Sequence, residues 1–296
     1  MFLATRQGVR VAVKQITAGA AGSAAGSASA ADSASEASFL KELDAMVGLS
    51  SPRVVQLFGV CVLPKAHGCG GMGLVMEYCA LGSLDGHLRA HEQSLTRAAL
   101  LAISVHIAEG LAYLHSPGVG ILHRDVAARN VLVAGDGSCK LADFGLARRV
   151  AADETYVATS AFPVRWSAPE VLSANTASQA SDVYALAMTL VEVFDGGRVP
   201  FSLELATNME VADAVVARGV RPARPRRMPA AVHALVARMW DASASERPTA
   251  AAVVEALLLQ QQRAATLGTG AETPASPDAV VYARFFVDPE SVTYQG

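Results

Sequence analysis

The sequence predicts an α+β fold, in which a small strand-rich lobe precedes a larger, mainly helical lobe. The chain has 296 residues, which is enough for two unequal lobes around a substantial core. Residues 9–16 alternate apolar and polar side chains, as a half-buried strand does, and residues 53–61 and 74–79 also have strand-like composition. From about residue 95 onward, apolar side chains recur at helical spacing instead.

The small lobe is expected to contain these three strands and one helix. In segment 9–16 the three valines share one face, and Arg10, Ala12 and Lys14 share the other. Residues 18–37 are a low-complexity Ala/Gly/Ser insert with too little apolar bulk to pack, and we expect a mobile loop there. Helical spacing follows in Phe39, Leu43, Met46 and Val47.

The large lobe is expected to be built from helices with long apolar stripes. Two of these stripes lie in segments 100–114 and 183–194, and Thr249 is a predicted N-cap for a last helix that carries Val253, Leu257 and Leu258. We expect one domain over residues 1–262, with 1–76 as the small lobe, 77–82 as a hinge and 83–262 as the large lobe. The Gly-, Thr-, Pro- and Ser-containing tail 263–296 is expected to be flexible.

The composition excludes several classes of protein. A net charge of −3 gives no electrostatic case for nucleic acid as a partner. The four cysteines form no C-x-x-C pair, which favours a reducing, cytoplasmic compartment over a disulfide framework or a zinc site. No run of about 18 apolar residues or signal-peptide core is present, so we expect no membrane segment in this chain, which would be soluble or the cytoplasmic portion of a larger protein.

Four short motifs carry the chemistry. They are Val11-Ala-Val-Lys14, His123-Arg-Asp-Val-Ala-Ala-Arg-Asn130, Asp143-Phe-Gly145 and Ala168-Pro-Glu170. Each is a weak signal alone, but four in this order and with these gaps are not a chance occurrence. Over residues 1–262 the chain resembles the eukaryotic protein kinase family. The resemblance implies the bilobal protein kinase fold and transfer of the ATP γ-phosphate to a protein hydroxyl with Mg²⁺ as cofactor.

The resemblance also implies a role for each residue of the predicted catalytic set. Lys14 would bind the inner phosphates of ATP, held in place by Glu42 of Phe39-Leu-Lys-Glu42. Asn130 and Asp143 would coordinate Mg²⁺ through oxygen atoms. Asp125 would orient the substrate hydroxyl and accept its proton.

The nucleotide base is expected between the lobes. Met76 occupies the gatekeeper position in Leu74-Val-Met-Glu-Tyr-Cys79, and Glu77 and Cys79 would offer backbone groups to adenine. Ala12 and Leu132 complete the predicted nucleotide-binding set.

The resemblance predicts structural contacts as well. His123 should stack on Phe144, with Met46 and Leu57 above it. Asp182 should brace the loop 123–130. Glu170 should form an ion pair with Arg247.

Two features indicate a tyrosine acceptor. Segment Asp125–Asn130 lacks the lysine of serine/threonine kinases and carries Ala-Ala-Arg, so that Arg129 would share the role of the lysine. Phe162-Pro-Val-Arg-Trp166 resembles the tyrosine-kinase substrate platform, and tyrosine-containing peptides are the expected partners. Serine/threonine or dual specificity is the alternative.

Tyr156 is the predicted regulatory residue. Phosphorylation would add about two negative charges, for which Arg124 and Arg148 are the expected docking groups. The alternatives are a plain surface tyrosine, or modification of Thr155 or Thr159 instead.

The pattern G-x-G-x-x-G occurs at Gly68–Gly73, but after Lys14, whereas the family's phosphate loop precedes the lysine. We therefore expect a hairpin turn on the far side of the small lobe. Met1-Phe-Leu-Ala-Thr5 resembles the strand that follows the family's glycine loop, with Met1 where the family has the valine above adenine. The first strand and the glycine-rich loop are missing. Either the sequence is incomplete or the protein begins here, in which case transfer should be slow and a kinase-like scaffold is the alternative function. The basic run Arg221–Arg227 is expected to be a solvated loop, with contact to phosphates or acidic peptides as the alternative.

Overall fold

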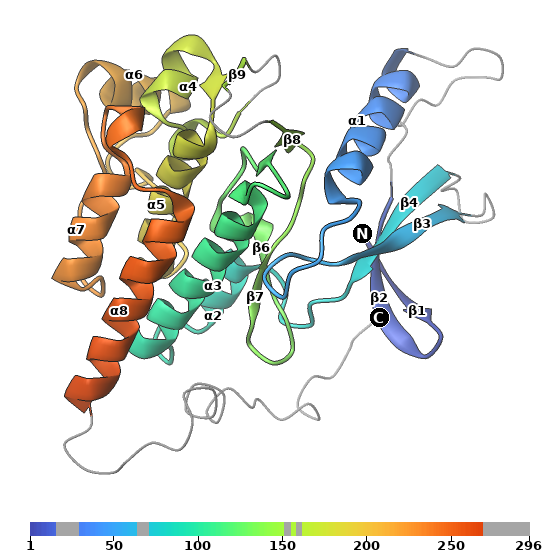
Figure 1. The fold of residues 1–296 in the computed structure, drawn as a ribbon, viewed down its shortest axis with the longest axis horizontal. Helices are drawn as coiled ribbons and strands as arrows, with labels where there is room; N and C mark the ends of the chain where they lie inside the picture. Colours follow the sequence, from blue (N-terminus) through green and yellow to red (C-terminus); the bar gives the residue numbers. More distant parts are fainter. Residues whose placement is uncertain (16–29, 64–70, 151–154, 158–161, 269–296) are drawn as a thin grey trace.

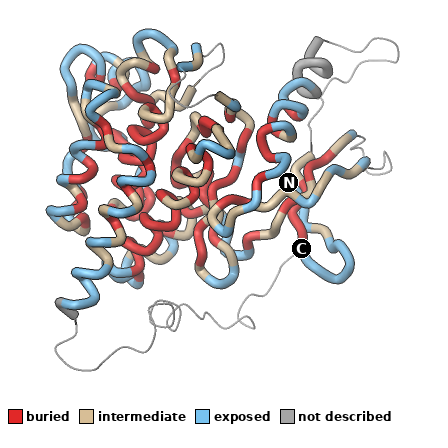
Figure 2. Tube along the Cα trace, in the orientation of Figure 1, coloured by how far each residue is buried: buried red, intermediate tan, exposed pale blue. Residues whose placement is uncertain are grey.

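The computed structural model describes residues 1–15, 30–63, 71–150, 155–157 and 162–268. It has the predicted α+β architecture, in which a small lobe with one four-stranded sheet lies beside a larger helical lobe (Figure 1). Buried residues continue from the helical lobe into the sheet (Figure 2), so the two lobes share one contiguous core.

The sheet of the small lobe is antiparallel throughout. Its strands are β1 (Phe2–Arg6), β2 (Val9–Gln15), β3 (Leu57–Leu63) and β4 (Gly71–Glu77), in the spatial order β1-β2-β4-β3. The tight β1–β2 turn places Gln7 and Gly8 at positive φ, the backbone conformation that glycine adopts at least cost. Helix α1 (Ala30–Met46) lies beside this sheet, and its Phe39 and Met46 are buried in the shared core (Figure 1).

The structure corrects some expectations for the small lobe. Of the predicted loop 18–37, residues 18–29 lie outside the described residues, and the rest is wrong because α1 already begins at Ala30. Alanine has the highest intrinsic helix propensity, and it outweighs the low-complexity composition there. The strand predicted at 53–61 is β3 and begins only at Leu57. The strand predicted at 74–79 is β4, and it runs from Gly71 to Glu77.

The glycine pattern lies at the β3–β4 hairpin, away from the β1–β2 turn. Gly71 and Gly73 are in β4 and pair with Leu63 and Cys61. The predicted turn is therefore wrong for residues 71–73, which are strand, while residues 68–70 lie outside the described residues.

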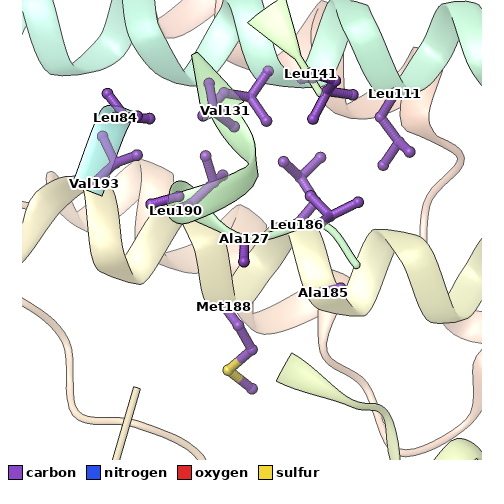
Figure 3. Packing of buried hydrophobic residues seen from close by; sticks show 14 of the residues in the cluster. Leu84, Leu111, Ala127, Val131, Leu141, Ala185, Leu186, Met188, Leu190 and Val193 are labelled. Atoms are coloured by element: carbon purple, nitrogen blue, oxygen red, sulfur yellow. The ribbon is translucent and has the colours of Figure 1, made fainter. Parts of the chain in front are cut away.

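The large lobe is built on two central helices, α3 (Arg97–His115) and α5 (Gln179–Phe194). Leu186 and Leu190 of α5 extend toward Ala127 and Val131 (Figure 3). The other helices are α2 (Leu84–Ala90), α4 (Pro169–Ala174), α6 (Asn208–Ala217), α7 (Ala230–Met239) and α8 (Ala250–Gly268).

Three short antiparallel strand pairs position the loops of the large lobe. They are β5 (Ile121–Leu122) with β8 (Arg148–Arg149), β6 (Val131–Val133) with β7 (Cys139–Leu141), and β9 (Tyr156–Val157) with β10 (Thr176–Ala177). Two turns of 3₁₀-helix, Ala128–Asn130 and Val164–Trp166, lie in the segments between them. The loop 123–130 is thereby held between β5 and β6.

Hydroxyl side chains cap the first turns of α5 and α8, and the cap of α8 is the one that the sequence predicts. Ser178 forms a capping box with Ser181 at α5, and the predicted cap Thr249 accepts a hydrogen bond from the backbone nitrogen of Ala252 at 3.2 Å. Helix α8 continues past residue 262 to Gly268, so residues 263–268 are helical and not flexible tail. Residues 269–296 lie outside the described residues.

Helix α3 is, within the described parts of the chain, the one helix long and apolar enough to cross a bilayer. Most of its side chains are buried, and it packs against α5 and α8 in the centre of the large lobe. Burial in a protein core accounts for its apolar composition.

The lobes are joined by backbone hydrogen bonds on both sides of the hinge. Leu81 donates to the carbonyl of Val133 at 3.0 Å, and Val133 donates to that of Gly82 at 2.8 Å. On the other side, Leu141 donates to the carbonyl of Arg53 at 2.8 Å. Gly110 of α3 lies against this carbonyl, where an added Cβ would be only 2.7 Å from the oxygen.

Candidate functional site

Three segments far apart in the sequence meet at Lys14 of β2. Its Nζ lies 2.6 Å from Oε1 of Glu42 on α1 and 2.9 Å from Oδ1 of Asp143, which follows β7. The Glu42 residue is only 7% exposed. The predicted pair therefore forms, and it ties α1 of the small lobe to the edge of the large lobe.

The charges of this cluster stabilise one another. Burial lowers the pKa of Lys14, but the Glu42 and Asp143 carboxylates more than offset this and raise it above its ordinary value. Burial alone would raise the pKa of Asp143, but the hydrogen bond and charge of Lys14, together with the Gly145 backbone and the charge of His123, outweigh burial and lower it. At neutral pH the cluster contains an ammonium and an ionised Asp143 carboxylate, as binding a phosphate-bound cation requires.

The backbone at Asp143 is left-handed, with φ at 61°. This conformation is uncommon outside glycine, and aspartate is among the residues that tolerate it. The next residue, Phe144, is fully buried beside His123, and the two ring centres lie 5.1 Å apart, as the sequence predicts. Met46 belongs to the same apolar core as Phe144, and Leu57 packs against that core; their position above the two rings stays a prediction.

Asp125 is held by its own loop. The Nη2 of Arg129 donates to Oδ1 of Asp125, and Nδ2 of Asn130 donates to the Asp125 carbonyl at 2.8 Å. The Asn130 carbonyl accepts from the backbone nitrogen of Ala142 at 2.8 Å, which brings Asn130 next to Asp143. These hydrogen bonds place the predicted base and the two predicted metal ligands in neighbouring segments.

Asp182 of α5 anchors this loop from beneath. One carboxylate oxygen accepts from the backbone nitrogen of His123 and the other from that of Arg124, both at 2.8 Å. His115 contacts the same carboxylate at 3.0 Å. Arg124 is left-handed, with φ at 66°, and these bonds hold that strained backbone in place.

The predicted nucleotide-binding residues line the junction of the lobes. Ala12 and Met76 are paired across β2 and β4, and each is 7% exposed. Leu132 lies in β6 and forms a bridge with Ser83, just beyond the hinge. These three side chains come from both lobes, as the walls of a cleft between them would.

Glu77 and Cys79 are predicted to offer backbone groups to adenine. The Glu77 nitrogen donates to the carbonyl of Gln56 at 2.9 Å, so this N–H is not the one offered to adenine. The Glu77 side chain pairs with Lys140 at 2.7 Å. Burial, helped by the charge of Glu77, raises the pKa of the Cys79 thiol to about 11.

Residues 162–166 form a shelf below the loop 123–130. The Arg165 guanidinium donates to the carbonyls of Pro200 and Leu205, both at 3.1 Å, and Nε donates to Oδ1 of Asn208 at 3.2 Å. Phe162, Pro163 and Trp166 line a pocket together with Arg124 and Asp182. The predicted substrate platform is thus fixed to the start of α6.

Tyr156 meets both of its predicted partners. Its ring centre lies 4.8 Å from the Arg124 guanidinium carbon and 5.8 Å from that of Arg148. Thr155 is exposed next to it, and Thr159 lies outside the described residues.

Two further arginine predictions have different outcomes. Arg247 donates to both carboxylate oxygens of Glu170 at 2.6 and 2.8 Å, which confirms the structural ion pair. In the basic run 221–227, Arg221 donates to the Trp240 carbonyl and Arg227 to that of Glu92. These two are therefore structural, and Arg224 and Arg226 are exposed.

The sequence analysis missed Glu192. This acid lies in α5, is 2% exposed, and accepts hydrogen bonds from the backbone of Ala128 and from Trp166. The available signal was a single glutamate within the apolar stripe 183–194, where an unpaired charge would not be tolerated.

The residues present fit a magnesium site of the kind that a nucleotide completes. Asn130 and Asp143 would supply two oxygen ligands, a number typical of Mg²⁺ bound together with substrate phosphates. No group of three or more His, Cys, Asp or Glu side chains in the described residues, at this site or elsewhere, is arranged to hold a metal.

Comparisons with known proteins agree with this geometry. The family model described as "Protein tyrosine and serine/threonine kinase" matches residues 3–257. The chain is 36% identical to mouse "Tyrosine-protein kinase TXK" over 254 residues, which cover 85% of this chain and 44% of that protein. It is 38% identical to mouse "Tyrosine-protein kinase Srms" over 75% of this chain and 43% of that protein. For the Drosophila melanogaster "Tyrosine-protein kinase Btk" the identity is 34%, over 77% of this chain and 28% of the relative. The chain thus spans less than half the length of these relatives.

Proposed function

Because this chain belongs to the protein tyrosine and serine/threonine kinase family, we propose that it transfers the γ-phosphate of ATP to tyrosine hydroxyls of protein substrates. The observation that carries the proposal is that Lys14, Glu42 and Asp143 form one ion cluster, and that Asn130 joins the segment of Asp143 to Asp125 through hydrogen bonds. These residues perform the two tasks of phosphoryl transfer, which are positioning of a charged nucleotide and aiming of a hydroxyl.

In this proposal Lys14 binds the inner phosphates, and Glu42 keeps its long side chain in one place. Asn130 and Asp143 hold Mg²⁺, which would offset phosphate charge. Adenine lies between Ala12 and Leu132, next to Met76, and takes backbone hydrogen bonds from the hinge.

Asp125 acts as the general base. Its carboxylate is fixed from one side by Arg129, and its backbone carbonyl by Asn130. The free carboxylate oxygen is available to a substrate hydroxyl, whose proton it accepts as the oxygen attacks the γ-phosphorus. Arg129 then supplies positive charge beside the reacting phosphate.

Tyrosine is the proposed acceptor. Arg129 is stacked on Trp166 and paired with Asp125, so the loop and the platform 162–166 form one surface. A tyrosine hydroxyl stands farther from its backbone than a serine hydroxyl, and such a surface suits the longer side chain. The three relatives named above are all described as tyrosine-protein kinases, which supports this choice over serine/threonine specificity. We also propose a cytoplasmic location.

Tyr156 is the proposed regulatory site. Its hydroxyl is carried by a ring that already contacts the guanidinium groups of both Arg124 and Arg148. A phosphate on it would exchange two cation–π contacts for charge-assisted hydrogen bonds to the same guanidinium groups. Equal specific activity of Tyr156→Phe and wild-type protein after incubation with ATP would contradict this role.

The test is phosphate transfer from ATP to two peptides that differ only in a tyrosine or serine acceptor. Transfer to tyrosine is expected, and Asp125→Asn should lower it by roughly 10²–10⁴-fold. Asp136→Asn, the same change at an exposed residue of the β6–β7 turn, is the matched control and should be unaffected. Wild-type incorporation equal to that of Asp125→Asn would reject the enzyme and leave a kinase-like scaffold as the alternative.

A further inference from the structure

Glu192 is a buried acid that the proposed reaction does not use. It lies in α5 among apolar side chains and is 2% exposed. Its Oε2 accepts hydrogen bonds from two different segments, the backbone nitrogen of Ala128 at 3.0 Å and the indole Nε1 of Trp166 at 2.7 Å. One oxygen atom therefore joins the loop 123–130 to the platform 162–166.

Both contacts lead toward Asp125. The Trp166 ring lies under the Arg129 guanidinium, with the guanidinium carbon 4.3 Å from the ring centre. Arg129 in turn donates to Oδ1 of Asp125. Ala128 is the neighbour of Arg129 in the chain, so Glu192 fixes both the backbone beside Arg129 and the ring on which it stacks.

The surroundings explain why this position is sensitive. Without the carboxylate, two buried donors would have no acceptor, which is costly in a protein interior. Burial raises the pKa of Glu192 to about 7, against the two hydrogen bonds and the Arg129 charge, which lower it. The charge of Asp85 on α2 raises it further.

We propose that Glu192 is a positioning residue, which orients the Arg129–Asp125 pair through Ala128 and Trp166. The expected effect of Glu192 on catalysis rests on the proposed function. The effect should fall on the transfer step and not on ATP binding, because Lys14 and Asp143 lie outside these contacts.

The first experiment compares two substitutions. Glu192→Gln keeps an oxygen acceptor and should retain kcat within about threefold. Glu192→Leu removes it and should lower kcat roughly 10- to 100-fold, with KM for ATP within about twofold of wild type. Should Glu192→Leu not fold, Trp166→Phe removes only the indole donor and should lower kcat about threefold to tenfold. Equal loss of kcat in Glu192→Gln and Glu192→Leu, or a matching rise in KM for ATP, would overturn the proposal.

A double-mutant cycle separates positioning from general destabilisation. In an Arg129→Ala background, Glu192→Leu should lower kcat by no more than about twofold further, because the group it positions is already gone. The matched control is Glu170→Gln, which weakens the buried ion pair with Arg247 in the same lobe. Its effect on kcat should multiply with that of Arg129→Ala. If the fold-losses of kcat for Glu192→Leu and Arg129→Ala also multiply, the role of Glu192 is merely structural.

A spectroscopic experiment tests the Glu192–Trp166 contact without any activity. If the wild-type chain transfers no phosphate, the proposed function fails, but the contact can still be tested. The sequence contains two tryptophans, so Trp240→Phe leaves Trp166 as the single emitter. Its emission should titrate with a midpoint near pH 7 and lose this transition in Glu192→Gln. Acrylamide quenching should rise at least twofold in both Glu192→Leu and Arg129→Ala. No titration and no change in quenching would overturn the positioning contact itself, whatever the activity.

Discussion

Replacing Lys14 by Met separates the structural from the catalytic use of the Lys14–Glu42 pair. The substitution leaves the Glu42 carboxylate, whose side chain is 9% exposed, without its partner at 2.6 Å. Breaking a fully buried pair costs about 3–5 kcal/mol. The Lys14 side chain is 33% exposed, so solvent screening reduces the expected loss of unfolding free energy to about 2 kcal/mol. The freed Asp143 adds little, because its side chain is 48% exposed.

A second substitution should restore the stability without the activity. Replacing both partners by apolar residues removes the unpaired charge, and such exchanges are often close to neutral. Lys14→Met/Glu42→Leu should therefore have an unfolding free energy within about 1 kcal/mol of wild type. Its phosphate transfer should stay roughly 100-fold or more below wild type, since both variants lack the ammonium that is proposed to bind the phosphates.

The assay is urea unfolding followed by circular dichroism, with hydrogen exchange of the α1 amides as the local measurement. In Lys14→Met these amides should exchange faster, and in the double variant they should return toward the wild-type rate. A double variant no more stable than Lys14→Met would refute the reasoning. It would mean that α1 moves away and exposes Glu42 to water once the lysine is gone.

Three further predictions concern stability and reactivity. The folded state holds the Glu192 proton more tightly than the unfolded chain, so roughly 3 kcal/mol of stability should be lost as pH rises from 4.5 to about 7. Urea unfolding at pH 5 and pH 8 should show this loss in the wild-type protein and not in Glu192→Gln. The same pH dependence in both proteins would contradict the prediction. Gly110→Ala should lower the unfolding free energy by about 1–2 kcal/mol, since its Cβ would meet the rigid Arg53 carbonyl, whereas Gly86→Ala, whose neighbour is a movable side chain, should be neutral or stabilising. The Cys79 thiol has a pKa of about 11, so at pH 7.5 it should react with iodoacetamide more than tenfold slower in the folded than in the urea-unfolded protein. Equal rates would mean that this thiol is exposed to solvent in the folded protein.

The fold could be predicted where local pattern and long-range packing agree. Segments 100–114 and 183–194 are buried along whole helices, so their apolar period is clear in the sequence, and α3 and α5 form there. The N-terminal turns of α1 could not be predicted, because an alanine-rich stretch satisfies the criteria for a loop and for a helix equally well. The start of β3 could not be predicted either, since Val54 and Val55 have the same strand propensity as β3 but bond with Leu141 of β7 in the other lobe.

The candidate site also has a part that could be predicted from the sequence and a part that could not. Lys14, Asp125, Asn130 and Asp143 lie in motifs whose residue types follow from the chemistry, and the structure brings them together. Glu192 belongs to no motif. Its function depends on the distance to Trp166, which only the three-dimensional packing of α5 against the platform determines.

The Asp182 carboxylate has a consequence for motion between the lobes. It secures the backbone ahead of Asp125 to α5, entirely within the large lobe, whereas Lys14 and Glu42 belong to the small one. Opening and closing about residues 77–82 would displace the Lys14 amine, which is proposed to bind phosphate, and leave Asp125, the proposed proton acceptor, stationary. Loosening this hinge should accordingly weaken nucleotide affinity well before it disturbs the alignment of the hydroxyl.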